Sequence, residues 1–193
     1  MAKLYFKYGT MGSSKSAEAL MTKFNYEQKG FKVLLMKPKT DNRDDTLNKT
    51  YVASRIGLKS EAYAFSLNEN LINLFVSLKK QEQYKVIIVD EAQFCTKEQI
   101  EQLKELTALV PVLCFGLKTN FKSFLFEGSK RLLEIADSIT EIKNICACGE
   151  KAIINGRFIN DKLVCNGDEI CIGGDETYKA LCYRCWQKLK KFN

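Results

Sequence analysis

The sequence contains no histidine among its 193 residues. This absence excludes Ser-His and Cys-His catalysis, so any general base must be a carboxylate, a lysine or a tyrosine. The chain also lacks an apolar run of the roughly 20 residues that a membrane-spanning helix requires. Its first residues, MAKLYFKYG, have no long apolar segment ending in small residues, as a secretion signal would. We therefore expect a cytoplasmic protein without a membrane partner.

The composition favours one packed domain of ordinary size with a small appendage. Hydrophobic residues make up 46% of the chain and charged residues 27%, which suits a buried core and disfavours disorder. The net charge of +7 is carried by scattered lysines, so we expect a solvated basic surface and no nucleic-acid partner. Eight cysteines, most of them from Cys146 onward, indicate metal binding better than disulfides in a chain without a signal peptide.

Strand-like and helix-like segments alternate over residues 1–144. Strands are expected at 3–8, in GFKVLLMKPK, EAYAF, KVIIVDEAQF and LVPVLCFGL, and at 138–145. Between them lie an apolar helix face of Ala17, Leu20, Met21 and Phe24, a helix capped by Asn68, a helix with a Thr96–Gln99 capping box, and a helix over 127–137. Residues 39–60 are polar and without a clear period, which predicts a long loop.

This order predicts an α/β fold, a P-loop-type parallel sheet with helices on both faces. The character of the chain changes at Cys146, where cysteines and glycines become frequent. We therefore expect an α/β domain over 1–144 and a small, loop-rich, metal-binding domain over 145–193.

The stretch GTMGSSKS lies between a strand and a helix, as a phosphate-binding loop should. Lys15 would reach the β and γ phosphates of a nucleotide, and Ser16 would ligate magnesium. The second glycine of the usual pattern is replaced by Ser14. If Ser14 has a left-handed backbone, serine should cost about 1 kcal/mol relative to glycine; if its φ is negative, no glycine is needed there.

The strand VIIVDE ends in two acids that complete such a site. Asp90 is the expected magnesium-associated acid, since an acid at the carboxyl end of a neighbouring strand holds that ion through water. Glu91 is the best candidate for taking a proton from an attacking hydroxyl, because the chain has no histidine.

Five ordered stretches, GTMGSSKS, KPKTDNR, VIIVDEAQF, GLKTNFKSFLF and IGGDETYKALCYRC, together resemble the thymidine kinases that carry a zinc-binding lasso domain. The resemblance covers nearly the whole chain. It implies transfer of the γ-phosphoryl group of ATP to the 5′ hydroxyl of thymidine, ATP with Mg²⁺ and structural Zn²⁺ as cofactors, a homotetramer, and Glu91 as the catalytic base.

The resemblance also assigns binding residues. On the ATP and phosphate side it implies Gly9, Thr10, Met11, Gly12, Ser13, Ser14, Lys15, Ser16, Asp41, Asn42, Arg43, Asp90, Glu91, Ala92 and Gln93. On the nucleoside side it implies Met11, Phe94, Leu117, Phe121, Phe126, Glu169, Ile170, Cys171, Ile172, Gly173 and Tyr178. Aromatic walls and backbone groups suit a pyrimidine, which has a flat apolar face and a polar edge.

Two cysteine pairs are candidate zinc ligands, Cys146 with Cys148 and Cys182 with Cys185. Four thiolates close a tetrahedral structural site and leave no open position for catalysis. The first pair has one intervening residue where the family normally has two, so either this loop still reaches the ion or Cys165 or Cys171 supplies a ligand.

Two alternatives stay open at this level. One is a kinase of another pyrimidine deoxynucleoside, because recognition through backbone atoms is not visible in a sequence. The other is a nucleotide-dependent nucleic-acid-binding protein that uses the cysteine unit as a zinc ribbon, although residues 145–193 lack the interleaved aromatics and arginines that such binding favours.

Overall fold

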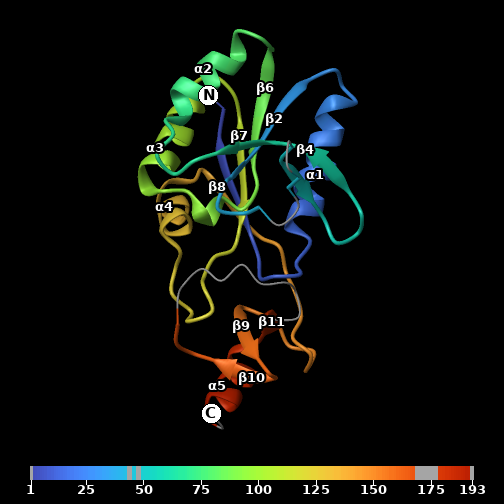
Figure 1. Ribbon diagram of the computed structural model, residues 1–193, viewed down its shortest axis with the longest axis vertical. Coiled ribbons are helices and arrows are strands. Elements are labelled where there is room, and N and C mark those ends of the chain that lie inside the picture. The colour runs from blue at the N-terminus through green and yellow to red at the C-terminus, as the bar shows by residue number, and fades with distance from the viewer. Residues whose placement is uncertain (1, 43–44, 47–48, 168–177, 192–193) are drawn as a thin grey trace.

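A computed structural model describes residues 2–42, 45–46, 49–167 and 178–191 (Figure 1). Its centre is a six-stranded sheet with the order β5-β2-β6-β7-β1-β8, in which every neighbouring pair is parallel. The strands are β1 (Leu4–Tyr8), β2 (Lys32–Pro38), β5 (Tyr63–Phe65), β6 (Tyr84–Val89), β7 (Val112–Gly116) and β8 (Ser138–Glu141). The expected α/β fold with a parallel sheet is confirmed.

Helices cover both faces of this sheet (Figure 1). The larger core lies under α2 (Leu71–Lys79), α3 (Lys97–Leu106) and α4 (Glu127–Ile135), and the other lies under α1 (Lys15–Glu27). Alternate residues of each strand enter opposite cores, as Leu34 and Leu35 do, because successive strand side chains point to opposite faces. The Thr96–Gln99 capping box is present at the start of α3, as expected.

The described part of residues 39–60 contains strands, where their polarity predicted a long loop. They include β3 (Tyr51–Ala53), which pairs antiparallel with β4 (Lys59–Glu61), so part of the EAYAF segment belongs to this hairpin and the rest to β5. Val52 anchors the hairpin in the core under α1, where it is 2% exposed. Strands of three residues are too short to display an alternating pattern, which explains why the sequence did not reveal them.

The helix expected after Asn68 begins two residues later. Asn70 is the N-cap, because its side-chain oxygen accepts a hydrogen bond from the N–H of Asn73. The carboxylate of Glu69 instead accepts from the N–H of Ser66, which closes a turn before the helix. Asparagine is a preferred N-cap residue, so the sequence alone does not distinguish Asn68 from Asn70. The turn that Glu69 closes places the start of the helix after Asn70.

Two members of the apolar face expected for α1 are exposed. Ala17 and Leu20 are buried, but Met21 is 48% exposed and Phe24 59% exposed. The side of α1 that carries Leu20 faces the sheet, whereas the side that carries Met21 and Phe24 faces solvent.

The carboxyl-terminal unit lies beyond one end of the sheet (Figure 1). It is more regular than expected: β9 (Ile154–Ile159) pairs antiparallel with β10 (Lys162–Val164) and β11 (Tyr178–Leu181), followed by α5 (Tyr183–Lys191). A separate core holds it together, made of Cys146, Ala152, Ile154, Phe158, Leu163, Leu181, Cys182 and Trp186. In the described residues, no helix is both long and apolar enough to cross a membrane.

Candidate active site

The phosphate loop connects β1 to α1 at the carboxyl edge of the sheet, where ligands bind in open α/β folds. Lys15 is 8% exposed, and its Nζ lies 2.7 Å from the carbonyl oxygen of Thr10 and 3.5 Å from Oγ of Ser13. Gly9 admits no side chain, because a Cβ there would lie 2.5 Å from the carbonyl oxygen of Ile142. The loop therefore curls around a buried ammonium group, next to the amino terminus of α1, which favours anions.

Ser14 has a left-handed backbone, with φ 62° and ψ 24°. The position therefore has the conformation for which the usual pattern supplies glycine, and serine is strained there. The Ser14 side chain makes no capping hydrogen bond to α1, so this side chain contributes no cap that would offset the strain.

Ser14→Gly should therefore stabilise the protein. We expect a gain of about 1 kcal/mol in the free energy of unfolding, which raises Tm by about 2–4 °C in a chain of this size. Differential scanning calorimetry measures this shift. The matched control is Ser77→Gly in α2, where the backbone is helical and glycine should lower Tm; a lower Tm for Ser14→Gly as well would contradict the strain.

Asp90 follows β6, and its carboxylate lies against Ser16, whose hydroxyl donates a hydrogen bond to it. The sequence predicted that β1 and β6 would be adjacent, but β7 lies between them. The side chains of Ser16 and Asp90 still meet. Asp90 is 3% exposed, and its Oδ1 has no hydrogen-bond partner among the described residues. Burial and then the charge of Glu91 raise the pKa of Asp90 to about 7, although the Ser16 hydroxyl, the Glu91 N–H and Lys15 lower it.

This environment fits a cation. A buried carboxylate with an orphaned oxygen is costly unless a positive charge or a hydrogen-bond donor compensates it. The Ser16 hydroxyl and the Asp90 carboxylate are oxygen ligands of the kind that Mg²⁺ prefers. The two residues expected to hold magnesium are therefore brought together, and their role stays a prediction.

Glu91 is the next residue, and it too has a left-handed backbone, with φ 51°. Its carboxylate accepts a hydrogen bond from Nε2 of Gln93, and Oε1 of Gln93 accepts from the N–H of Leu117 at a distance of 3.0 Å. Gln93 is 2% exposed, so a buried amide fixes the Glu91 carboxylate to the end of β7. Non-glycine residues held in this backbone region are concentrated at functional sites.

Asp41, expected on the nucleotide side, is buried after the end of β2. Its Oδ2 lies 3.3 Å from Nζ of Lys37, and Asp45 lies 3.0 Å from the same ammonium. Asn42 is exposed, and Arg43 lies outside the described residues. Lys37 is only 1% exposed and was missed in the sequence, where a lysine next to a proline carries no signal of burial.

The residues expected around the nucleoside fall into two groups. The rings of Phe94 and Phe126 pack edge to face with centroids 5.7 Å apart, near Leu117. Phe121 is 2% exposed, and the guanidinium of Arg157 lies 5.3 Å from its ring centroid. Tyr178 opens β11 and is half-buried, whereas the stretch from Glu169 to Gly173, with Ile170, Cys171 and Ile172, lies outside the described residues.

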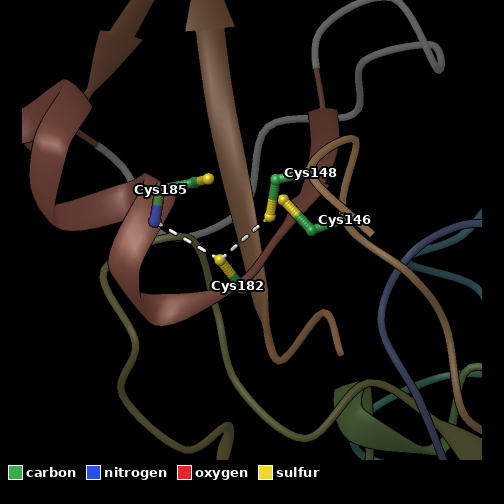
Figure 2. A group of neighbouring side chains, drawn as sticks. All are labelled: Cys146, Cys148, Cys182 and Cys185. Atoms are coloured by element: carbon green, nitrogen blue, oxygen red, sulfur yellow. Dashed lines mark hydrogen bonds between the residues drawn. The ribbon is translucent and has the colours of Figure 1, made fainter. Parts of the chain in front are cut away.

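Four cysteines form a cluster that is suited to a metal ion (Figure 2). The Sγ atoms of Cys146, Cys148, Cys182 and Cys185 all lie within 4.8 Å of one another. The Sγ atoms of Cys148 and Cys182 are 3.7 Å apart, close to the roughly 3.8 Å edge of a tetrahedron with Zn–S bonds of about 2.3 Å. The single residue between Cys146 and Cys148 is therefore enough. Cys165 is not in the cluster, and Cys171 lies outside the described residues.

Hydrogen bonding within the cluster already favours a thiolate. Burial opposes ionisation of Cys146, but donation from the backbone of Cys148 and Cys182 and from neighbouring thiols lowers its pKa to about 7. The thiols of Cys148 and Cys182 raise the pKa of Cys185 to about 12. Metal ions bind the thiolate form of cysteine, so metal binding at this cluster would release protons. Cys95 and Cys114 are buried in the core, as expected, and burial raises the pKa of both thiols.

Three further residues reach the phosphate loop and were missed in the sequence. Asn144 and Asn155 hydrogen-bond to its backbone, and Nη1 of Arg55 lies 3.3 Å from the position of a Cβ on Gly12. Asparagine is common in turns and on surfaces, so neither composition nor spacing distinguishes these residues before the chain is folded.

A loop that curls around Lys15, a buried acid beside it and a second carboxylate at the same sheet edge form the arrangement predicted for a P-loop kinase, here with an added four-cysteine unit. The family model described as "Thymidine kinase" matches residues 2–186. The chain therefore belongs to the thymidine kinase family, and the resemblance seen in the sequence is confirmed.

Individual relatives agree with this membership. The thymidine kinase of Legionella pneumophila (strain Paris) is 44% identical and covers 94% of this chain and 88% of that protein. The thymidine kinase of Enterobacteria phage T4 is 42% identical over 99% of this chain and 98% of its own. The thymidine kinase of Shewanella oneidensis is 40% identical over 94% and 95%.

Proposed function

We propose that this chain transfers the γ-phosphoryl group of ATP to the 5′ hydroxyl of thymidine and so forms thymidine monophosphate. The observation that carries this proposal is the meeting of Lys15, Ser16, Asp90 and Glu91 at one sheet edge, in a chain whose relatives align over nearly its full length. The family match supports the kinase reaction, and the loop geometry supports ATP as the donor.

In the proposed mechanism, Lys15 releases the Thr10 carbonyl and binds the β and γ phosphates, while the loop N–H groups surround them. Ser16 and Asp90 would hold Mg²⁺, which when bound would neutralise charge on the transferring phosphoryl group. Glu91, held by Gln93, accepts the proton of the 5′ hydroxyl as that oxygen attacks the γ-phosphorus. The bond between the γ-phosphorus and the β,γ-bridging oxygen breaks, and ADP leaves. Most of the rate enhancement comes from positioning and charge neutralisation.

We assign the binding of thymidine to the residues that the family resemblance names, Phe94, Phe121, Phe126, Leu117 and Tyr178. Support comes from the aromatic packing of Phe94 with Phe126 and from the burial of Phe121 against the carboxyl-terminal unit. The stretch 169–173 is proposed to close over the base as a lasso. The two proposed domains, 1–144 and 145–193, have separate apolar cores, in keeping with this division.

The cysteine cluster is proposed to hold a structural Zn²⁺ that anchors the lasso. Four sulfur ligands fill a tetrahedral shell, so the metal takes no part in chemistry.

We also propose a cytoplasmic homotetramer. The exposed side chains of Met21 and Phe24 on α1 are apolar groups that a second copy would cover. Light scattering measures the subunit number, and a monomer at assay concentration would refute the assembly.

The test is phosphorylation of a nucleoside panel with ATP and Mg²⁺, using protein whose zinc content is known from elemental analysis. We expect thymidine to be turned over with kcat/KM of about 10⁴ M⁻¹s⁻¹ or more, typical of enzymes acting on their own substrates. Deoxyuridine and deoxycytidine are the comparison. Faster turnover of either would replace thymidine by another pyrimidine deoxynucleoside, and turnover of none would refute the proposal.

A further inference from the structure

We propose that Asn144 and Asn155 are positioning residues that fix the phosphate loop, Asn144 from the segment that leads into the carboxyl-terminal unit and Asn155 from within that unit. Nucleotide binding then depends on the integrity of the carboxyl-terminal unit. The inference rests on the proposed role of residues 9–16 as the phosphate loop.

Asn144 joins the loop to the turn that carries the first two cysteines. Its Nδ2 donates to the carbonyl oxygen of Met11 at 2.9 Å and to Oγ1 of Thr10 at 3.1 Å. Its Oδ1 accepts from the N–H of Ile145, and its own carbonyl accepts from the N–H of Ala152, both at 2.9 Å. Every polar group of the side chain is therefore engaged, one end on the phosphate loop and the other on the backbone that leads to Cys146.

Asn155 makes the second link, from the middle strand of the small sheet. It lies in β9, paired with Ala180 of β11, and is 3% exposed. Its Oδ1 accepts from the N–H of Met11 at 2.7 Å, and its Nδ2 donates to the carbonyl oxygen of Thr119 at 3.1 Å. If these partners moved away, the buried Asn155 amide would be left without hydrogen bonds, which costs its full desolvation free energy. These bonds therefore hold β9, the phosphate loop and the segment at Thr119 together.

The two asparagines thus hold both backbone groups of Met11, the N–H and the carbonyl. The carbonyl oxygen of the preceding residue, Thr10, accepts a hydrogen bond from Nζ of Lys15 at 2.7 Å. A displacement of the Thr10–Met11 segment would therefore move the loop backbone that is proposed to surround the phosphates, together with the carbonyl that Lys15 contacts before it binds them. The parallel sheet fixes the loop at Gly9, whose N–H donates to the Gly116 carbonyl at 3.3 Å, but that bond lies before this segment.

The main variant is Asn144→Ala, which removes both donations to the loop and leaves Asn155 in place. We expect the Kd for ATP with Mg²⁺, measured by calorimetry without a nucleoside, to rise about tenfold, as the loss of two hydrogen bonds predicts. Amide hydrogen exchange in the peptide that contains residues 9–16 should become faster. Zinc content should stay at the wild-type level, which separates a local effect from loss of the small unit.

Asn160→Gly is the matched control, because this exposed asparagine has φ 50° and lies in the turn between β9 and β10. It should leave the Kd for ATP and the loop exchange unchanged. Should Asn144→Ala not fold, Asn144→Ser provides the same two measurements.

An unchanged Kd for ATP together with unchanged loop exchange in the Asn144 variants would overturn the inference. If the wild-type protein neither binds ATP nor phosphorylates thymidine, the proposed function fails instead, and the exchange measurement still decides whether Asn144 holds the loop.

Discussion

Glu91→Gln is expected to lower kcat for thymidine phosphorylation by about 10²–10⁴-fold, the usual contribution of a positioned general base. Glutamine has the shape of glutamate, and its side-chain oxygen still accepts the hydrogen bond from Gln93. The nucleoside should therefore bind as before, with KM for thymidine changed by less than about twofold, which is the signature of an interaction made only in the transition state. Steady-state kinetics over a thymidine titration measures both quantities.

The control is Glu105→Gln, which removes an exposed carboxylate from α3 without contact to the site. It should leave kcat and KM unchanged. Turnover of Glu91→Gln at the wild-type rate would remove Glu91 from the mechanism, since no histidine is present to substitute for it. A large rise in KM with normal kcat would instead make Glu91 a binding residue.

The fold of the larger unit could be predicted because each segment carried its own signal. VIIV before Asp90 is apolar without interruption, which indicates a strand buried on both faces, and the Thr96–Gln99 pair sets the start of α3 through bonds between near neighbours. The phosphate loop could be located for the same reason, since its residues are contiguous. Its strain at Ser14 needed the backbone angle, which a sequence does not contain.

Features that depend on distant partners could not be predicted. Met21 and Phe24 are exposed because the sheet beneath α1 covers only the side of that helix that carries Leu20. The links from Asn144 and Asn155 to Met11 span more than 130 residues of sequence. Such contacts follow from the topology of the whole chain, and local pattern has no record of them.

Cys182→Ser is expected to abolish metal binding and, with it, thymidine kinase activity. The small unit has a core of eight buried residues, and two of them, Cys146 and Cys182, belong to the metal cluster itself. A core of this size seldom suffices alone, and binding of zinc contributes about 10–16 kcal/mol to folding in comparable small units. Elemental analysis should show zinc falling from about one ion per chain to nearly none, and kcat/KM should fall at least about 100-fold, equivalent to about 2.7 kcal/mol.

The matched control for this prediction is Cys165→Ser, in the same unit but outside the cluster. It should keep the zinc and most of the activity; if it loses the metal as Cys182→Ser does, Cys165 is a ligand and the assignment of the cluster is wrong. Full activity of metal-free Cys182→Ser would show that the small unit folds on its eight-residue core alone.

Cys182→Ser should also weaken ATP binding, because Asn144 and Asn155 can hold Met11 only while the strand and turn that carry them are folded. Loss of thymidine binding with normal ATP affinity would therefore separate the anchoring of the lasso from the support of the phosphate loop.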